Sequence, residues 1–194
     1  MKLFTFLLTL VLVGVCRGET YTVAQDGSGN YLNIQDAIIS VPEGSVIEVA
    51  PGTYVENLNS LGRDLVIRSR DGADKTTITS AGADFALEIS LGASVITVDG
   101  FTFDVTSKPG ITINQQAVAT IINCRFPGSS SNSIASIEVQ TNEPPQQSSI
   151  ENCEFGPGQR AITTSGDSSI LIDTCGFDGF SGSGSIIDCG AFND

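Results

Sequence analysis

The sequence of 194 residues has no histidine and only 9 Lys and Arg against 22 Asp and Glu, for a formal net charge of −13. A chain this acidic repels anionic polymers, so we expect no nucleic acid partner. The missing histidine and the absence of a CxxC pair argue against a metal site, and we expect no cofactor. The acidic residues are scattered, which favours a solubilising surface over a cation site. No Asn-x-Ser/Thr sequence occurs, so asparagine-linked glycosylation is not expected.

The first eighteen residues are the only strongly apolar segment. Residues 1–18 combine Lys2 with an apolar run from Leu3 to Val15 and end in small residues around Arg17. This pattern is typical of a secretory signal peptide, and it is too short for a transmembrane helix, which needs about 20 apolar residues. Its removal takes away two basic residues and no acidic one. We therefore predict a secreted, extracellular protein without a membrane span.

A short phrase recurs through the second half of the chain, in the order apolar, polar, Asn or Asp, Cys, any residue, Phe. It occurs as IINCRF at 121–126, IENCEF at 150–155 and LIDTCGF at 171–177, with a variant VDGFTF at 98–103 and a last copy IIDCGAF at 186–192. The phenylalanines of the first four phrases in chain order are spaced by 23, 29 and 22 residues. A period of this length is typical of one coil of a solenoid.

The segments between the phrases are short and rich in β-forming residues, namely ASVITV, GITI, ASIEV, RAITT and SSILI. Each is bounded by turn residues, which predicts strands of four to six residues. No helical period follows Val41, so a doubly wound sheet is excluded. A β-sandwich is less favoured, because its strands do not repeat one phrase per coil. We predict an all-β fold, a parallel β-helix formed by residues 46–194.

Stacked coils place equivalent residues directly above one another, about 4.8 Å apart. The phrase therefore predicts three ladders. One is an internal aromatic stack of Phe103, Phe126, Phe155 and Phe177. A second ladder contains Phe101, Cys124, Cys153 and Cys175. A third lies where the chain turns a corner and contains Gly100, Asn123, Asn152 and Thr174.

Four cysteines remain after removal of the signal peptide, namely Cys124, Cys153, Cys175 and Cys189. In an oxidising compartment they could form two disulfides. Side chains of one ladder point in parallel, however, which is unfavourable for the disulfide dihedral angle. Buried thiols are the preferred interpretation, and the disulfide state stays open.

Residues 19–45 are predicted to form an N-terminal strand and a capping helix. YTVA is a first strand, DGSGN a turn, and Asn33 the cap of a short helix that ends at Pro42. The apolar face of this helix contains Ile34, Ala37, Ile38 and Val41. VIEVAPGTY then predicts the first full strand and its turn. Such a cap covers apolar core and strand edge at the open end of a solenoid.

This segment resembles the start of the pectinesterases and, more loosely, other proteins of the pectin lyase-like superfamily. The matching strings are VAQDGSGNY, IQDAI and GTYVEN, in which Gly52, Tyr54 and Glu56 fit a GxYxE pattern. The resemblance continues through LVIRSRDGADKTTITS at 65–80 and GFTF at 100–103. It implies a right-handed parallel β-helix.

The resemblance also implies where an active site would lie. Pectinesterases remove methyl groups from esterified polygalacturonate with a nucleophilic Asp and an acid/base Asp on neighbouring coils, helped by glutamines and an Arg, in segments resembling QAVAL, QDTL, DFIFG and LGRPW. Only QAVAT at 116–120 is similar here, and PGSSSNSIASIEV follows Phe126 where QDTL is expected. The residue sets of pectate lyases and polygalacturonases are also missing. The catalytic residues are therefore unknown.

Three further groups of residues could contribute to a site. Asp99, Asp104, Asp173 and Asp178 lie near predicted strand ends and could meet on one face, although solvated turn residues are the simpler interpretation. Arg125 and Arg160 could contact an anionic sugar chain or pair with nearby acids. Tyr31 and Tyr54 could stack on sugars or pack within the cap.

We accordingly predict a secreted, non-catalytic β-helix protein of the cell surface, cell wall or matrix that binds polysaccharide or a cell-surface protein along one face. The alternative is a reduced pectinesterase-like or lyase-like enzyme acting on pectin-type polysaccharide. An open last coil would also permit end-to-end self-association.

Overall fold

The computed structural model describes residues 18–82, 85–90, 94–104, 109–114, 116–128, 135–140, 147–157, 160–166, 168–179 and 187–189. The predicted signal peptide lies outside these residues except for Gly18. Among the residues described, no helix is long and apolar enough to cross a membrane.

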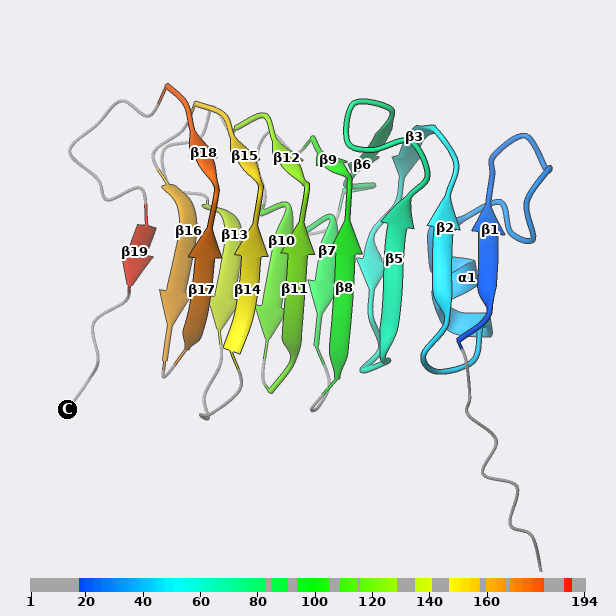
Figure 1. Ribbon diagram of the computed structural model, residues 1–194, viewed down its shortest axis with the longest axis horizontal. Helices are drawn as coiled ribbons and strands as arrows, with labels where there is room; N and C mark the ends of the chain where they lie inside the picture. Colours follow the sequence, from blue (N-terminus) through cyan, green and yellow to red (C-terminus); the bar gives the residue numbers. More distant parts are fainter. Residues whose placement is uncertain are drawn as a thin grey trace, which may run out of the picture.

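Strands line up in three parallel sheets that run the length of the molecule (Figure 1). The first sheet contains β1 (Thr20–Val23), β2 (Val46–Val49), β5 (Leu65–Ser69), β8 (Val95–Asp99), β11 (Val118–Ile122), β14 (Gln147–Glu151) and β17 (Ser169–Asp173). The second contains β3 (Gly52–Val55), β6 (Thr76–Thr79), β9 (Thr102–Phe103), β12 (Arg125–Phe126), β15 (Glu154–Phe155) and β18 (Gly176–Phe177). The third contains β4 (Leu58–Asn59), β7 (Leu87–Ile89), β10 (Ile111–Asn114), β13 (Ala135–Gln140), β16 (Arg160–Ser165) and β19 (Ile187–Cys189).

The chain visits the three sheets in turn, so that β2, β3 and β4 form one coil and β5, β6 and β7 the next. Neighbouring strands in every sheet pair in parallel, as in β11 with β8 and β13 with β16. This arrangement confirms the predicted right-handed parallel β-helix. It excludes the β-sandwich, which is built from antiparallel sheets.

The core is made of inward-facing side chains in register from coil to coil. In the first sheet, Ile47, Ile67, Val98, Ile121 and Ile150 occupy one row, and each is at most 1% exposed. In the second sheet, the predicted phenylalanine stack is confirmed. Ring centroids are 5.4 Å apart for Phe103 and Phe126, 4.9 Å for Phe126 and Phe155, and 5.1 Å for Phe155 and Phe177. Each aromatic pair contributes about 0.5–1.5 kcal/mol beyond its buried area.

The predicted corner ladder is confirmed by the backbone. Asn123, Asn152 and Thr174 have φ of 54°, 49° and 52°, and Gly100 has φ of 77°. Glycine and asparagine tolerate this left-handed conformation, whereas a β-branched threonine is strained in it. The corner lies between the first and second sheets.

The predicted cysteine ladder is also present. Cys124 and Cys153 are buried, Cys175 is half-buried, and all three are free thiols. Each Sγ lies within hydrogen-bonding distance of the carbonyl oxygen two residues earlier, at 3.2 Å from Ile122 for Cys124 and 3.3 Å from Glu151 for Cys153. The Cys189 side chain lies outside the described part.

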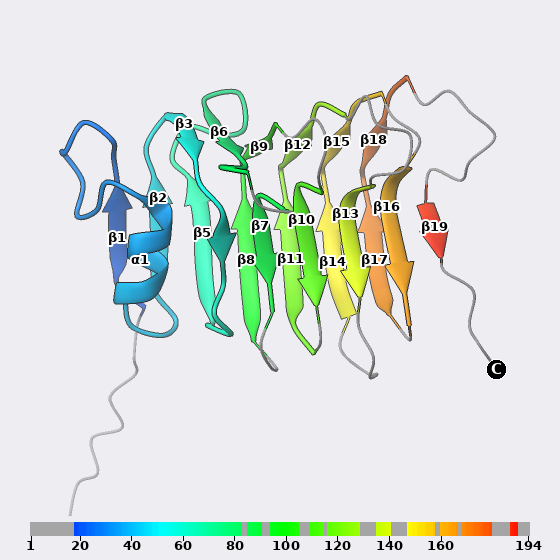
Figure 2. The same ribbon diagram turned by 180° about the vertical axis from the view of Figure 1, so that it is seen from behind.

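The N-terminal cap contains α1 (Ile34–Ser40), which lies beside β1 and β2 (Figure 2). Its predicted apolar face is confirmed, since Ile34, Ala37, Ile38 and Val41 are at most 1% exposed. The predicted side-chain cap is wrong. Asn33 stands at the N-cap position, but its side chain makes no cap hydrogen bond and donates to Asp36 instead.

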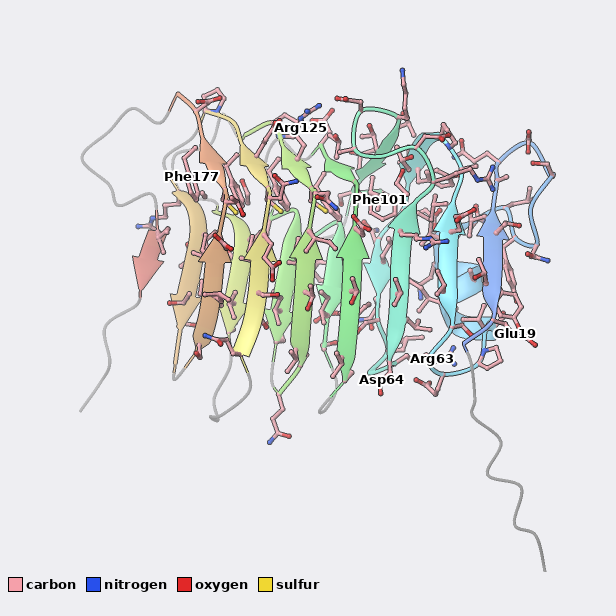
Figure 3. The ribbon with its side chains drawn as sticks, in the orientation of Figure 1. Glu19, Arg63, Asp64, Phe101, Arg125 and Phe177 are labelled. Carbon is pink, nitrogen blue, oxygen red and sulfur yellow. The ribbon has the colours of Figure 1, made fainter. Side chains whose placement is uncertain are left out.

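Side chains from the first coil and its connections satisfy both ends of α1. The Glu56 carboxylate accepts the backbone N–H groups of Ile34 at 3.0 Å and Gln35 at 2.9 Å. At the other end, the Arg63 guanidinium donates to the carbonyl oxygens of Ile38 and Val41. The carboxylate and the cation each suit the helix dipole at their end. Figure 3 shows Arg63 beside Asp64 at the lower edge of the cap.

Candidate functional site

The four predicted aspartates do not come together. Asp99 and Asp173 lie in one row of the first sheet, but they are separated by Ile122 and Glu151 on the two coils between them. Asp99 accepts a hydrogen bond from the Asn123 side chain. Asp104 and Asp178 are exposed and follow β9 and β18, at the end of the second sheet. These four residues therefore provide no pair of carboxylates. Asp104 and Asp178 follow their strands, as the turn interpretation expects, whereas Asp99 and Asp173 are the last residues of β8 and β17.

Arg125 is paired with acids rather than open to a ligand. Its Nε donates to Glu154 Oε2 at 2.7 Å, and its Nη1 donates to Asp74. The hydrogen bonds that Arg125 donates to Glu154 and Asp74 raise its pKa above the usual value. The ion pairs link β12 to β15 and to the segment between β5 and β6, and Figure 3 shows Arg125 at the upper edge of the molecule. Arg160 begins β16 and is partly buried.

Of the two candidate tyrosines, Tyr54 lies in the first coil and Tyr31 in the cap. Tyr54 is completely buried, its hydroxyl donates to the Ala50 carbonyl at 3.0 Å, and burial raises its pKa. It packs in the core and offers no surface to a sugar. Tyr31 is partly buried, and its ring lies 6.3 Å from that of Tyr21 with the planes tilted by 56°.

The outward side of the third sheet carries polar side chains that the sequence analysis did not single out. One row, in register across successive coils, contains Asn59, Glu88, Thr112, Glu138 and Thr163. A second row contains Asn114, Gln140 and Ser165. We call these two rows the polar face. They contain amides, hydroxyls and carboxylates, and neither row includes a lysine or an arginine among the residues described.

Glu88 is held from both sides in the polar face. Asn59 Nδ2 donates to Glu88 Oε2 at 2.6 Å from the coil before, and Asn114 Nδ2 donates to Oε1 at 3.1 Å from the coil after. Asn59 is itself fixed by Gln35 of α1, whose side-chain amide accepts from the Asn59 N–H at 2.8 Å and donates to its carbonyl at 3.2 Å. The cap thus fixes the first coil of the polar face.

Glu138 is the second carboxylate of the polar face. It lies two coils after Glu88, with Thr112 between them in the same row. At the usual strand spacing, the Cα atoms of the two glutamates are about 10 Å apart. Gln140 Nε2 lies 3.4 Å from Glu138 Oε2, and Gln140 is exposed. Thr112 is only 7% exposed, so the accessible groups lie on either side of it.

The sequence held a signal for this face in the alternation of ITIN at 111–114 and SIEVQ at 136–140. Every second residue there is apolar and buried. The polar residues between them must face outward. Gln116 of the QAVAT string is exposed and lies between β10 and β11. Over the described residues, no group of three or more Cys, Asp and Glu side chains could hold a metal ion.

Comparison with solved structures supports the fold. The pectin methylesterase PemA from Erwinia chrysanthemi superposes with a TM-score of 0.60 at 15% sequence identity, covering 83% of this chain and 55% of that protein. At this identity the similarity shows the fold alone.

Comparison of sequences identifies the family. A pectinesterase/pectinesterase inhibitor of Brassica campestris is 32% identical over 131 residues, and a probable pectinesterase/pectinesterase inhibitor of Brassica napus matches to the same extent. The match covers 56% of this chain but only 22% of each relative, so the chain matches about a fifth of their length. The Pectinesterase family model matches residues 20–139, which is more than half of the chain. The chain therefore belongs to the pectinesterase family.

Proposed function

We propose that this protein acts on pectin-type polysaccharide and engages it along the polar face. The observation that carries the proposal is the pair of polar rows in register, one across β4, β7, β10, β13 and β16 and the other across β10, β13 and β16. Amides and carboxylates of this kind exchange hydrogen bonds with sugar hydroxyls. Because the rows repeat with the coils, they offer an extended surface to an extended chain. Family membership supports pectin as the polysaccharide.

The charge of the protein favours esterified segments of the polymer. The net charge is −13, and the polar face carries Glu88 and Glu138. A de-esterified uronide chain is a polyanion and is repelled by such a surface. A methyl-esterified segment is neutral, so it approaches the surface without electrostatic repulsion. We expect stronger retention on highly esterified pectin, with the difference shrinking at high salt.

Family membership favours an enzyme over the non-catalytic function predicted from the sequence. If the protein is an enzyme, Glu88 is the nucleophile, because the side-chain amides of Asn59 and Asn114 hold its carboxylate in place. Its oxygen would attack the ester carbonyl while Glu138 protonates the departing methoxide, and water would then hydrolyse the resulting anhydride. The Gln140 amide could donate to the developing oxyanion. The two carboxylates lie two coils apart, whereas the resemblance implies neighbouring coils.

The competing hypothesis is that the protein binds pectin without catalysing a reaction. It is supported by the missing QDTL, DFIFG and LGRPW segments in the sequence. Both hypotheses include secretion with loss of residues 1–18. Both also include a cap formed by residues 19–45 and coils formed by residues 46–194. End-to-end self-association of the protein remains a prediction under both hypotheses.

One experiment tests ligand and chemistry together. Protein expressed without residues 1–18 is incubated with immobilised pectin of high methyl ester content and with polygalacturonate, and retained protein and released methanol are measured in the same wells. Retention on esterified pectin with methanol above the blank supports the enzyme, and retention without methanol supports the binding form. If the protein is not retained on either polymer and releases no methanol, the proposal is wrong.

Matched variants locate the activity. Gln140→Ala removes an exposed amide from the polar face, and Gln147→Ala removes one from the first sheet. We expect only Gln140→Ala to weaken retention, by a factor of about three to ten for one lost hydrogen bond. If methanol is released, Glu138→Gln should reduce the rate by at least about 100-fold, and Glu151→Gln on the first sheet should not. Equal effects within either pair would contradict this location.

A further inference from the structure

Three cysteines whose side chains the structure describes, Cys124, Cys153 and Cys175, occupy equivalent places on successive coils. The Glu154 N–H donates to the Cys124 carbonyl, and the Gly176 N–H donates to the Cys153 carbonyl, both at 2.9 Å. These are the hydrogen bonds of a parallel ladder, in which equivalent Cα atoms lie about 4.8 Å apart. That spacing lies within the Cα separation of about 4.4–6.8 Å at which a disulfide can form.

The thiols point the same way in the resting structure. Besides the carbonyl two residues earlier, each Sγ also lies near a carbonyl of the preceding coil, at 3.8 Å from Val98 for Cys124, 3.6 Å from Ile121 for Cys153 and 3.5 Å from Ile150 for Cys175. Parallel thiols do not have the dihedral angle of a disulfide, so one side chain must rotate before a bond can form.

The cysteines differ in access to solvent. Cys124 and Cys153 are 2% and 0% exposed, whereas Cys175 is only half-buried. An oxidant therefore reaches Cys175 before the other two, and the Cys175 side chain has the greater freedom to rotate. Buried Cys153 lies directly behind it on the coil before.

We propose that Cys153 and Cys175 form a redox modification site, in which oxidation joins the last two coils of the ladder by a disulfide. The oxidant is a low-molecular-weight disulfide such as oxidised glutathione. The Cys175 thiolate attacks one sulfur of the oxidant, forming a mixed disulfide and releasing one thiol. The Cys153 thiolate then attacks the Cys175 sulfur and releases the second thiol. Two protein thiols are oxidised, one oxidant disulfide is reduced, and two protons pass from the cysteines to the released thiolates.

The order of events follows from solvent access, and the local electrostatics set the pH dependence of the two steps. Burial raises the pKa of Cys175, so the first step should speed up as the pH rises through the alkaline range. The neighbouring Cys124 thiol lowers the pKa of Cys153, which favours the Cys153 thiolate as the second nucleophile. Burial raises the pKa of Cys124 well above its usual value.

The test is oxidation of the folded, reduced protein without residues 1–18 by oxidised glutathione, with and without urea, followed by disulfide mapping under non-reducing conditions by mass spectrometry. We expect one main product in native buffer, the Cys153–Cys175 disulfide. Its formation should slow hydrogen exchange in β17 about tenfold or more, because the cross-link restrains local opening. In urea, the pairing should become mixed.

Two variants keep the test decisive. Cys153→Ser should accumulate glutathione on Cys175, and Cys124→Ser should still form the Cys153–Cys175 bond. A folded wild-type protein that stays reduced would overturn the proposal. So would a stable Cys175–glutathione adduct, a native bond to Cys124 or Cys189, or a Cys153–Cys175 bond that forms only in urea. These outcomes do not depend on whether the protein binds pectin.

Discussion

The side-chain amide of Asn152 donates to the side-chain oxygen of Asn123, one coil earlier, at 2.7 Å. Both residues have a left-handed backbone, and Asn123 in turn donates to Asp99 at 2.7 Å. Asparagine at this corner has two separate roles, since it adopts positive φ at low cost and carries a donor and an acceptor that bridge coils.

Two substitutions at Asn152 separate these roles. Asn152→Gly keeps the backbone conformation and loses the side-chain bond, which should lower the free energy of unfolding by about 1 kcal/mol. Asn152→Ala also places a Cβ in the left-handed region and should cost about 1–2 kcal/mol more. Urea unfolding measures both. Equal stability of the two variants would contradict the backbone role.

The phenylalanine stack should contribute most at its centre. Phe126 is fully buried and stacks on Phe103 and Phe155 with interplanar angles of 10° and 6°. Phe126→Leu should lower the free energy of unfolding by about 1–2 kcal/mol, through lost stacking and a small void. Phe177→Leu, at a half-buried position, is the matched control and should cost less. A larger loss at Phe177 would contradict this account of the core.

The cap of α1 depends on a residue 22 positions further along the chain. Glu56→Ala removes the acceptor of two backbone N–H groups and should cost about 1–2 kcal/mol, whereas Glu56→Gln keeps one acceptor oxygen and should cost about half as much. Hydrogen exchange of the α1 amides and urea unfolding check this. Asp36→Asn, in the first turn of the helix, is the control, and an equal effect there would argue against Glu56 as the cap.

Glu48 should give the stability a dependence on acid pH. Hydrogen bonds from Arg68 and then Arg70 hold its pKa below the usual value. A carboxyl group with a lowered folded pKa stabilises the protein fully above about pH 5, and this contribution is lost as the pH falls through the folded pKa. Glu48→Gln should therefore cost about 0.5–1 kcal/mol at pH 7 and flatten the acid limb of the stability curve.

Urea unfolding of Glu48→Gln and of the wild type at a series of pH values between 7 and 3 measures this curve. If Glu48→Gln and the wild type lose stability in parallel between pH 5 and pH 3, the two arginines do not contribute in this way.

The repeated phrase predicted the aromatic, cysteine and corner ladders because each coil returns the phrase to the same place. Phe126 above Phe103 and Asn152 above Asn123 follow directly from that rule. The contacts of Glu56 with the start of α1 and those of the polar face did not follow, because the residues involved are separated by coils of unequal length and belong to no common phrase. Glu88 meets Asn59 and Asn114 at separations of 29 and 26 residues, and Arg125 meets Asp74 at 51. Such pairs become visible only once the strand register is known.

The most direct test of the proposed function is a map of where the ligand binds. Backbone amide shifts of isotope-labelled protein are followed during titration with methyl-esterified oligogalacturonides. We predict shifts concentrated in β7, β10 and β13, strongly reduced by Gln140→Ala and unaffected by Gln147→Ala. Shifts centred on the first sheet, or none at saturating ligand, would contradict the polar face as the pectin-binding surface.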